Sequence, residues 1–421
     1  MRVLSVPALL EQLPLGAGVA VVRDGASTIV ATAPAHVRVA HGADGFAALD
    51  EIELEGGWWA GYLAYDLGRA VERVVPWAAA DRSIPDLVLA RFDARATFTP
   101  GEDVVVEGRG EGRHRLDQAL WRARRSEEHE EPVGLEQWTS SLDRSVYADA
   151  VKTIHGLLDA GECYQVNLTR RLSAPHAADP RALYLALDRQ NPAPHAALLT
   201  FGPEAPYCPA VVSASPELFL SRRGDRVTTR PIKGTNADQA ALLGSSKDRA
   251  EHAMIVDLAR NDLGRVCVPG SVRTLQLAAV EAHPGLFHLV STIEGRLRPR
   301  TGLADLVHAT FPPASITGAP KPRVMQAIED IEPVRRGVYC GAIGWIDADA
   351  RAAELAVAIR TFTITHGYTD LGVGGGIVAD SDAASEWAET ELKAHRLLAA
   401  AGCVTPTSLV AQLSAPRPET P

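Results

Sequence analysis

The segments VYCGAIGWI (338–346) and ELAVAIRTFTI (354–364) are two strand-like runs connected through Asp347, Ala348 and Asp349. A short polar connection between two such runs is typical of a hairpin, so the pair predicts antiparallel strands. Strand and helix patterns alternate along the chain without a repeated strand–helix–strand period and without an internal repeat of about 20 to 50 residues. The pattern predicts an α+β fold in which large antiparallel sheets form a sandwich-like core flanked by helices.

The composition limits the kinds of partner that this chain can have. It has 421 residues, of which 46% are hydrophobic, so a large buried core is expected. The formal net charge of −10 argues against nucleic acid and against an anionic membrane as partners. No stretch approaches the length of a membrane span, residues 1–15 lack the pattern of an export signal, and the five cysteines are scattered singly. We therefore expect a cytoplasmic protein with reduced thiols.

The charge-dense residues 107–132 suit an exposed connection or helix and mark a possible boundary. We expect an N-terminal region over residues 1–138, a main region over 145–402, and a Pro-rich tail over 403–421 that is frayed.

The segment RPIKGT (230–235) places one lysine on an extended backbone. Pro231 disfavours helix for the residue before it, and Gly234 lets a ligand approach the backbone closely. Lysines are mostly solvated surface charges, so this segment alone favours an exposed Lys233.

Polar residues alternate with apolar ones in residues 163–169, where Gln165, Asn167 and Thr169 share one face of a predicted strand. The pattern by itself favours exposure of this polar face to solvent.

Acidic residues occur on two predicted helices. Ser245 and Asp248 resemble a capping pair at the start of one helix, and Glu251 lies on the apolar stripe of that helix, where a buried carboxylate needs a cation. Glu386 and Glu389 lie one turn apart on the last helix. They either bind Mg²⁺ or belong to the surface, with Glu389 paired to Lys393 at i,i+4.

Two loop-like segments adjoin these helices. The backbone of GVGGGI (372–377) could cradle a carboxylate or phosphate, and a plain tight turn explains it equally well. In FPPASITGAPK (311–321), Pro320 suits the first turn of a helix, and the hydroxyls are favoured as caps over ligand donors. The signatures of P-loop proteins, α/β-hydrolases and zincins are absent from the sequence.

Several segments in order and spacing resemble the chorismate-utilising enzymes, a family that includes anthranilate synthase, the isochorismate and salicylate synthases and aminodeoxychorismate synthase component I. The segments are YQVNLT (164–169), SPE (215–217), PIKGT (231–235), DLARNDLGR (257–265), FPPASITGAPK (311–321), RGVYCG (336–341) and GGGI (374–377). The resemblance covers about residues 147–400, and GGWWAGYLAYDLG (56–68) resembles the N-terminal region of the family less specifically.

The resemblance implies a Mg²⁺-dependent site between two antiparallel sheets. It places metal ligands at Glu251, Glu386 and Glu389, with Asp248 as an assisting acid. Positions for binding the substrate chorismate and its carboxylates fall on Gln165, Gly234, Thr235, His288, Ser315, Tyr339, Arg360, Gly374, Gly375, Gly376 and Lys393. At position 315 many relatives have threonine, so this chain keeps the hydroxyl and loses a methyl group.

Two positions separate the reactions of the family. Relatives that add water have a lysine base where this chain has Gln165, and relatives that make anthranilate have an alanine in place of Lys233. Lysine at position 233 is the pattern of the aminodeoxychorismate synthase branch, which aminates chorismate at C4. The resemblance thus implies that Lys233 attacks the ring as a nucleophile while Glu217 acts as general acid. The pKa of Lys233 must then be lowered by burial and by nearby cations, with Arg230 and the metal as contributors.

Ammonia is expected from a separate glutamine amidotransferase subunit, because no glutaminase region is present in the sequence. The alternatives are an anthranilate synthase component I, an isochorismate or salicylate synthase, and a chorismate-binding protein without turnover. A purely electrostatic role for Lys233 also stays open.

Overall fold

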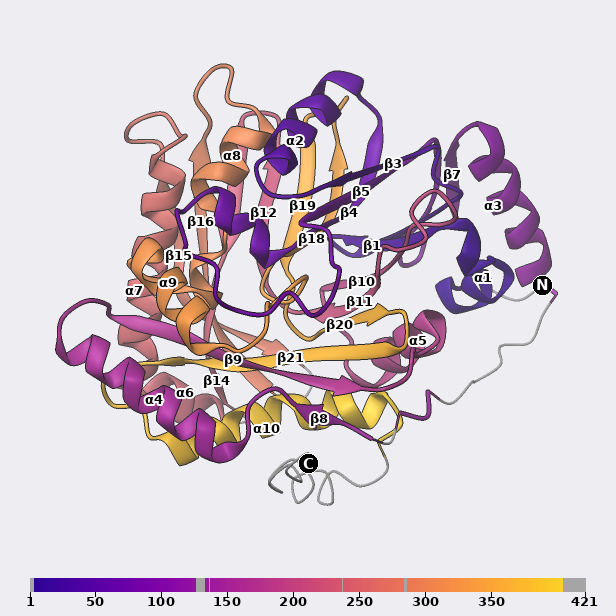
Figure 1. Cartoon of the computed structure of the whole chain (residues 1–421). Helices are drawn as coiled ribbons and strands as arrows, with labels where there is room; N and C mark the ends of the chain where they lie inside the picture. The colour runs from indigo at the N-terminus through magenta and orange to yellow at the C-terminus, as the bar shows by residue number, and fades with distance from the viewer. Residues whose placement is uncertain (1–3, 126–132, 136, 237, 284–285, 404–421) are drawn as a thin grey trace.

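The computed structural model describes residues 4–125, 133–135, 137–236, 238–283 and 286–403. Within these residues two large sheets form the centre of the molecule, and every ladder between their strands is antiparallel (Figure 1). The first, sheet A, has the strand order β17 (Gly318–Ala319), β9 (Gln165–Ala174), β21 (Tyr368–Ile377), β20 (Thr361–Thr365), β11 (Ala210–Ser215), β10 (His195–Thr200), β1 (Val19–Asp24), β2 (Ser27–Thr32), β6 (Ala94–Phe98) and β7 (Val105–Gly108), with β8 (Thr139–Ser140) paired to β9.

The second, sheet B, carries most of the remaining strands. Its order is β14 (Ile232–Asn236), β16 (Leu286–Arg296), β13 (Arg226–Arg230), β12 (Leu218–Arg223), β19 (Ala352–Val357), β18 (Ala342–Asp347), β4 (Trp58–Leu63), β5 (Leu87–Phe92) and β3 (His36–Ala40), with β15 (Arg273–His283) paired to β16.

Helices cover the outer faces of the sheets. They are α1 (Val6–Gln12), α2 (Asp44–Glu55), α3 (Gly110–Ala123), α4 (Arg144–Asp159), α5 (Pro180–Gln190), α6 (Gln239–Gly244), α7 (Ser246–Gly264), α8 (Leu303–Thr310), α9 (Lys321–Ile331) and α10 (Ala383–Ala400), with short 3-10 turns η1 (Leu15–Ala17), η2 (Tyr65–Ala70) and η3 (Ala314–Ile316). In Figure 1, α4 and α10 run along the lower side of the molecule beside β9 and β21, and α7 flanks the opposite sheet at the left.

The core has the layers that a sandwich of two sheets requires. One apolar cluster lies between the sheets and joins residues such as Val22 and Leu199 of sheet A to Tyr62 and Ile343 of sheet B. Separate clusters pack α1, α3, α5 and α10 against sheet A, and α2, α7 and α8 against sheet B. The predicted α+β fold with antiparallel sheets is confirmed.

The N-terminal strands complete both sheets. In sheet A, β1 pairs with β10, and in sheet B, β4 pairs with β18. The residues expected as an N-terminal region, 1–138, thus share their sheets with strands from the main region over 145–402. The tail expected over 403–421 lies outside the described residues apart from Cys403.

The hairpin predicted at 338–364 is present as β18 paired with β19. The second run does not continue as one strand, because Arg360 adopts a positive φ of 51° between β19 and β20 and sends the chain to sheet A. Residues 107–132, expected as a connection or helix, include the helix α3.

Two local expectations are wrong, on β9 and at Pro320, and one of the two alternatives for residues 372–377 is excluded. The polar face of β9 does not meet solvent: Gln165, Asn167 and Thr169 are 0%, 6% and 4% exposed, because Gln165 faces Lys233 of sheet B over Gly376 and Thr169 donates to Glu332. The glycines of 372–377 form no turn but lie within β21, where Gly374 pairs with Thr169. The residue at the N-cap of α9 is Pro320, one position before the first turn.

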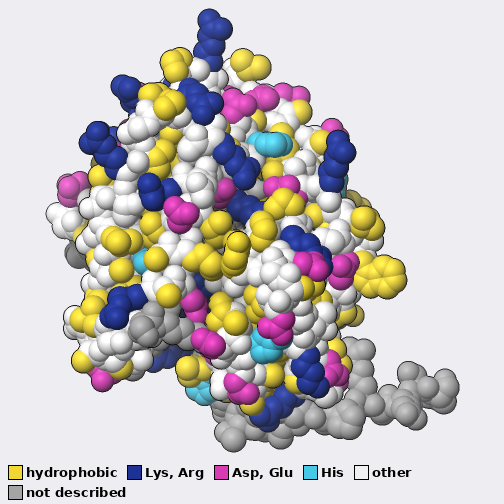
Figure 2. Space-filling view, turned by 90° about the vertical axis from the view of Figure 1, so that its left-hand side faces the viewer, with side chains coloured by type: hydrophobic (Ala, Val, Ile, Leu, Met, Phe, Trp, Pro, Cys, Tyr) yellow, Lys and Arg dark blue, Asp and Glu magenta, His cyan; other side chains and the backbone are white. Residues whose placement is uncertain are grey.

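The surface has no broad basic face on the side shown in Figure 2, where acidic and basic side chains are interspersed. Among the described helices, none combines the length and apolar character that a bilayer crossing requires. All five cysteines are free thiols, as expected.

Candidate active site

Lys233 and Gln165 meet over the backbone of Gly376. Lys233 lies on β14, the end strand of sheet B, and its side chain is only 15% exposed, so the expected surface position is wrong. A Cβ atom built on Gly376 would lie 3.1 Å from Lys233 Nζ and 2.7 Å from Gln165 Nε2. Glycine at position 376 therefore lets a residue of sheet B approach sheet A closely.

The environment of Lys233 favours the neutral amine. Burial lowers the pKa of Lys233, and the positive charge of Lys393 adds to this effect, although Glu251 opposes it from 4.0 Å away. Because the net shift is downward, the amine loses its proton more readily than a free lysine does. Arg230, expected as the nearby cation, instead pairs with Glu281, so Lys393 supplies the positive charge.

The amide of Gln165 is buried and available to a ligand. Within the described part of the chain, neither Nε2 nor Oε1 of this fully buried side chain has a hydrogen-bond partner. Buried amide groups are normally satisfied, and an unsatisfied one costs about 1–3 kcal/mol. The arrangement is therefore suited to a bound molecule that offers both a donor and an acceptor.

Glu217 lies just before β12, and its carboxyl interacts with the charge of Lys233. Burial raises the pKa of its carboxyl to about 7, although a hydrogen bond from Ser315 and the charge of Lys233 oppose the shift. Its Oε1 lies 3.5 Å from the backbone N–H of Ile232, next to Lys233. A carboxyl with this pKa is partly protonated near neutral pH and can donate a proton. Ser315, expected as a cap, contacts this carboxylate instead.

The acids of α10 surround the neighbouring glycine, Gly375. A Cβ atom there would lie 3.2 Å from Glu386 Oε2 and 3.9 Å from Glu389 Oε1. Glu386 accepts a hydrogen bond of 2.6 Å from the Ser381 hydroxyl, and Glu389 lies 2.7 Å from Lys393 Nζ. Lys393 also donates to the Gly374 carbonyl oxygen at 2.9 Å, which ties α10 to β21.

The remaining predicted metal-site acids lie on α7, across from α10. A Cβ atom on Gly234 would lie 3.2 Å from Cβ of Asp248, so Asp248 packs against β14 at the residue that follows Lys233. Carboxylate oxygens are the donors that Mg²⁺ prefers. However, no three His, Cys, Asp or Glu side chains of the described residues lie close enough together to hold a metal. The donor chemistry fits Mg²⁺, whereas the present spacing, with lysines beside Glu251 and Glu389, does not form a closed site.

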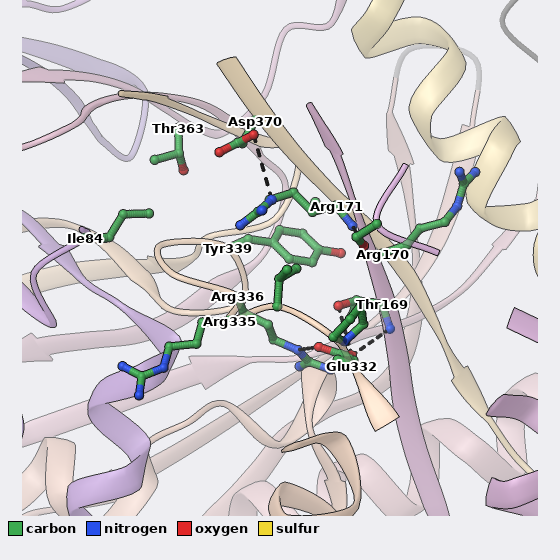
Figure 3. A pocket seen from close by; sticks show the side chains of 14 residues that line it. Ile84, Thr169, Arg170, Arg171, Glu332, Arg335, Arg336, Tyr339, Thr363 and Asp370 are labelled. Atoms are coloured by element: carbon green, nitrogen blue, oxygen red, sulfur yellow. Dashed lines mark hydrogen bonds and ion pairs between the residues drawn. The ribbon is translucent and has the colours of Figure 1, made fainter. Parts of the chain in front are cut away.

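Tyr339 adjoins β21, and Arg360 directly precedes β20, the neighbouring strand. The Tyr339 ring lies against Gly372, where an added Cβ would approach a ring atom to 2.2 Å, and it lines a small pocket with Thr363 and Asp370 (Figure 3). No carboxylate of the described residues pairs with the half-buried Arg360, and burial lowers the pKa of its guanidinium. A cation without an acidic partner is suited to an anionic ligand.

His288 is buried on β16, opposite Thr235 of β14 in the strand register. The placement of the Thr235 side chain lies outside the described part of the structure, so its predicted contact with substrate stays a prediction.

The sequence patterns missed a buried ion pair that holds the site together. Arg336 donates to Glu332 at 2.7 Å and to the backbone carbonyls of Ile316 and Asn167 at 3.0 and 2.6 Å. Glu332 also accepts from the backbone N–H of Thr169 at 2.8 Å, and Figure 3 shows the pair below Tyr339. The i,i+4 spacing of Glu332 and Arg336 was visible in the sequence, but nothing there indicated burial.

Comparisons with known proteins agree with this arrangement. The profile of the family described as chorismate binding enzyme matches residues 12–399. The chain is 39% identical over 352 residues to aminodeoxychorismate synthase component 1 of Salmonella typhimurium, covering 80% of this chain and 75% of that protein. It is 40% identical over 371 residues to an anthranilate synthase component 1 of Haloarcula marismortui, covering 80% of this chain and 74% of that protein.

Solved structures show the same fold. The crystal structure of anthranilate synthase component I from Streptococcus pneumoniae matches with a TM-score of 0.78 at 29% identity, covering 88% of this chain and 92% of that chain. The menaquinone-specific isochorismate synthase MenF of Escherichia coli shares the fold with a TM-score of 0.73 at 19% identity, covering 95% and 92% of the two chains. By the extent of the family match and the identity to these relatives, the chain belongs to the chorismate binding enzyme family.

Proposed function

We propose that this enzyme aminates chorismate at C4 with ammonia and forms 4-amino-4-deoxychorismate. The observation that carries the proposal is the position of Lys233, a buried amine with a lowered pKa that meets Gln165 of sheet A over Gly376 and interacts with the carboxyl of Glu217. Relatives named aminodeoxychorismate synthase component 1 support this reaction. Because other relatives are named anthranilate synthase, the experiment must also test for anthranilate formation.

In the proposed mechanism, Glu217 and Lys233 act together on the ring. Glu217 donates its proton to the C4 hydroxyl, which leaves as water, while the neutral Lys233 amine bonds to C2 and the ring double bond shifts. Ammonia then bonds to C4 and becomes an ammonium group there. The double bond shifts back, and the bond between C2 and Lys233 breaks, which releases Lys233 as a neutral amine. The amide of Gln165 has no basic group with which to activate water. Its role in the proposed mechanism is to orient the incoming nucleophile by hydrogen bonding.

The two carboxylates of chorismate need positive partners. Arg360 and Lys393 supply charge, Tyr339 supplies a hydroxyl, and the backbone of β21 supplies donors at Gly374 to Gly376. Mg²⁺ would be held by Glu251, Glu386 and Glu389, with Asp248 nearby, and would neutralise substrate carboxylate charge. A separate glutamine amidotransferase would supply ammonia, the product would enter 4-aminobenzoate and folate synthesis, and the enzyme would work in the cytoplasm.

The direct test incubates the purified chain with chorismate, Mg²⁺ and ammonium, then adds aminodeoxychorismate lyase and measures 4-aminobenzoate. We expect the wild-type chain to form 4-aminobenzoate and Lys233→Ala to lower the yield by at least about 10²-fold. Lys152→Ala should leave the yield unchanged, because the Lys152 side chain is 77% exposed. Fluorescent anthranilate in place of 4-aminobenzoate would assign the enzyme to anthranilate synthesis, and saturable chorismate binding without any product would make it a binding protein.

Intact-mass measurement on chorismate-treated protein separates covalent from electrostatic roles of Lys233. We expect an adduct on the wild-type chain that is absent from Lys233→Ala. An adduct that persists in the variant would exclude Lys233 as the nucleophile.

A further inference from the structure

A small cavity has Glu217 on its wall, whereas Lys233 is not among the residues that line it. It is bordered by α7, β12, β13 and the segment around η3, and its volume open to water is about 30 Å³. About 10–15 Å³ is enough for one water molecule if polar partners are present. The polar side chains on its wall belong to Glu217, Thr229, Asp262, Thr310 and Ser315. The cavity therefore has room and partners for one or two waters between Glu217 and Asp262.

Asp262 at the far end of the cavity belongs to a buried ion pair that the proposed mechanism does not use. Its Oδ2 lies 2.6 Å from Nζ of Lys321, which also donates to the Thr310 carbonyl oxygen at 2.8 Å, and both residues are 6% exposed. Oδ1 of Asp262 lies 3.8 Å from the guanidinium of Arg265, whose side chain is 53% exposed. Asp262 thus lies between the cavity and the protein surface.

The proposed reaction creates a need for such a connection. Glu217 gives up one proton in each turnover, and it is only 4% exposed. Its carboxyl also interacts with Ser315, which lines the cavity as well, and with the backbone of Ile232 and the charge of Lys233 on the substrate side. A proton can return through the substrate site, from the ammonium group formed at C4 or from solvent after product release, or it can return from the cavity.

We propose that the cavity is a water-filled proton path through which Asp262, held by Lys321, returns a proton to Glu217 after each turnover. The inference rests on the proposed function, since it requires Glu217 to act as a general acid. When the C4–O bond breaks, the proton of Glu217 leaves with the hydroxyl as water. A cavity water then protonates the Glu217 carboxylate and is reprotonated by Asp262, which takes a proton from solvent on the Arg265 side, so no charge accumulates.

The electrostatics of Asp262 agree with this role. Burial raises the pKa of Asp262 even though Lys321 and Arg265 oppose the shift, with Glu72 adding a small effect in the same direction as burial. The raised pKa gives Asp262 a share of the protonated form that an exposed aspartate lacks at the same pH. Asp262 acts through water and Glu217, so it is a positioning residue and touches no substrate.

Rapid-quench kinetics on the full chain, with chorismate, Mg²⁺ and ammonium, tests the path. Thr229→Val removes a hydroxyl from the cavity wall, Ala259→Val fills part of the cavity, and Asp262→Asn removes the acid. Thr228→Val is the matched control, because it makes the same change on the other face of β13. In the three test variants we expect the first turnover at the wild-type rate and later turnovers at least about tenfold slower, which gives a burst of one product per enzyme.

The expected burst distinguishes a proton path from structural damage. A variant that slows the first and later turnovers equally has lost site geometry, and this result in all three variants would overturn the proposal. Wild-type steady-state rates in both cavity variants would also overturn it, even if Asp262→Asn fails to fold. The proposed function fails differently, because the wild-type chain would then make no 4-amino-4-deoxychorismate.

Discussion

Glu217 and Lys233 depart from their ordinary protonation behaviour for one shared reason, burial, which acts in opposite directions on an acid and a base. Burial raises the pKa of the Glu217 carboxyl to about 7 and lowers that of the Lys233 amine. Both groups thereby favour the neutral form, which is the form that a general acid and a nucleophile each need.

The pH dependence of turnover follows from these directions. Glu217 is active when protonated, so kcat/KM should fall as the pH rises through about 7. At low pH, protonation of the Lys233 amine removes the nucleophile and slows turnover. We expect Glu217→Gln to lower kcat by about 10²–10⁴-fold and to remove the decline above neutrality from the remaining activity. An unchanged decline in this variant would assign that limb to another group.

The same shift predicts an effect on folding. Because the folded state holds the Glu217 proton more tightly than the unfolded chain does, its contribution to stability is complete below the ordinary carboxyl pKa of 4.5 and is lost as the pH rises through about 7. Glu217→Gln should therefore gain stability relative to the wild type between pH 5 and pH 8, as measured by urea unfolding at about these two pH values. An equal difference at both values would contradict the shift.

At the scale of elements, β21 shows why a run of glycines stands in a strand. Each glycine leaves room for a group from another element: the Tyr339 ring at Gly372, Glu386 at Gly375, and both Gln165 and Lys233 at Gly376. The strand therefore brings sheet A, sheet B and α10 together at one place, at the cost of the lower strand propensity of glycine.

Gly376→Ala should displace the two side chains that meet there. The added methyl would lie 2.7 Å from Gln165 Nε2, so we expect kcat to fall by about 10²-fold while the fold is retained. Gly156→Ala on α4, where nothing lies within 4 Å, is the control and should slightly raise the melting temperature. Wild-type turnover in Gly376→Ala would mean that the close approach has no role in the reaction.

The ion pair of Arg336 and Glu332 joins the loop after α9 to β9 and η3. Both side chains are nearly buried, at 2% and 4% exposure. Removing one partner leaves a buried charge, so Glu332→Gln should lower the free energy of unfolding by about 3–5 kcal/mol. The exposed pair of Arg113 and Asp117 provides the comparison: Asp117→Asn should cost about 0.5 kcal/mol or less. Equal losses in the two variants would contradict the structural role.

At the scale of the whole molecule, the predicted Mg²⁺ site depends on acids from two distant parts of the chain. Glu251 lies on α7 beside sheet B, and Glu386 lies on α10 beside sheet A. A metal between them would stabilise the approach of the two sheets, so Mg²⁺ with chorismate should raise the melting temperature. A free ligand concentration of about 100 times Kd would raise the free energy of unfolding by about 2.7 kcal/mol.

The matched variants locate the site. Glu251→Gln and Glu386→Gln should each abolish the Mg²⁺-dependent shift, whereas the exposed Glu111→Gln should keep it. Thermal unfolding with Mg²⁺, and after its removal by a chelator, provides the measurement. A shift that survives in both site variants would place the metal elsewhere.

The sequence by itself determined the fold class, the main hairpin and the order of the family motifs. These depend on local composition and spacing. Examples are the polar connection between β18 and β19 and the N-cap of α7, where the Ser245 hydroxyl accepts from the backbone N–H of Asp248. The pattern also indicated that Glu251 needs a cation, and Lys233 lies 4.0 Å from it.

Only the tertiary structure decided which polar groups are buried and what they face. Gln165 and Lys233 both fit a solvated surface when their segments are considered alone, because alternation in a strand does not reveal what covers each face. The covering residues are far away in the chain: Lys233 and Glu332 lie against the polar face of β9, and Gly376 of β21 lies beside Lys233. Burial, and with it the lowered pKa of Lys233, follows from that packing and not from any neighbour in sequence.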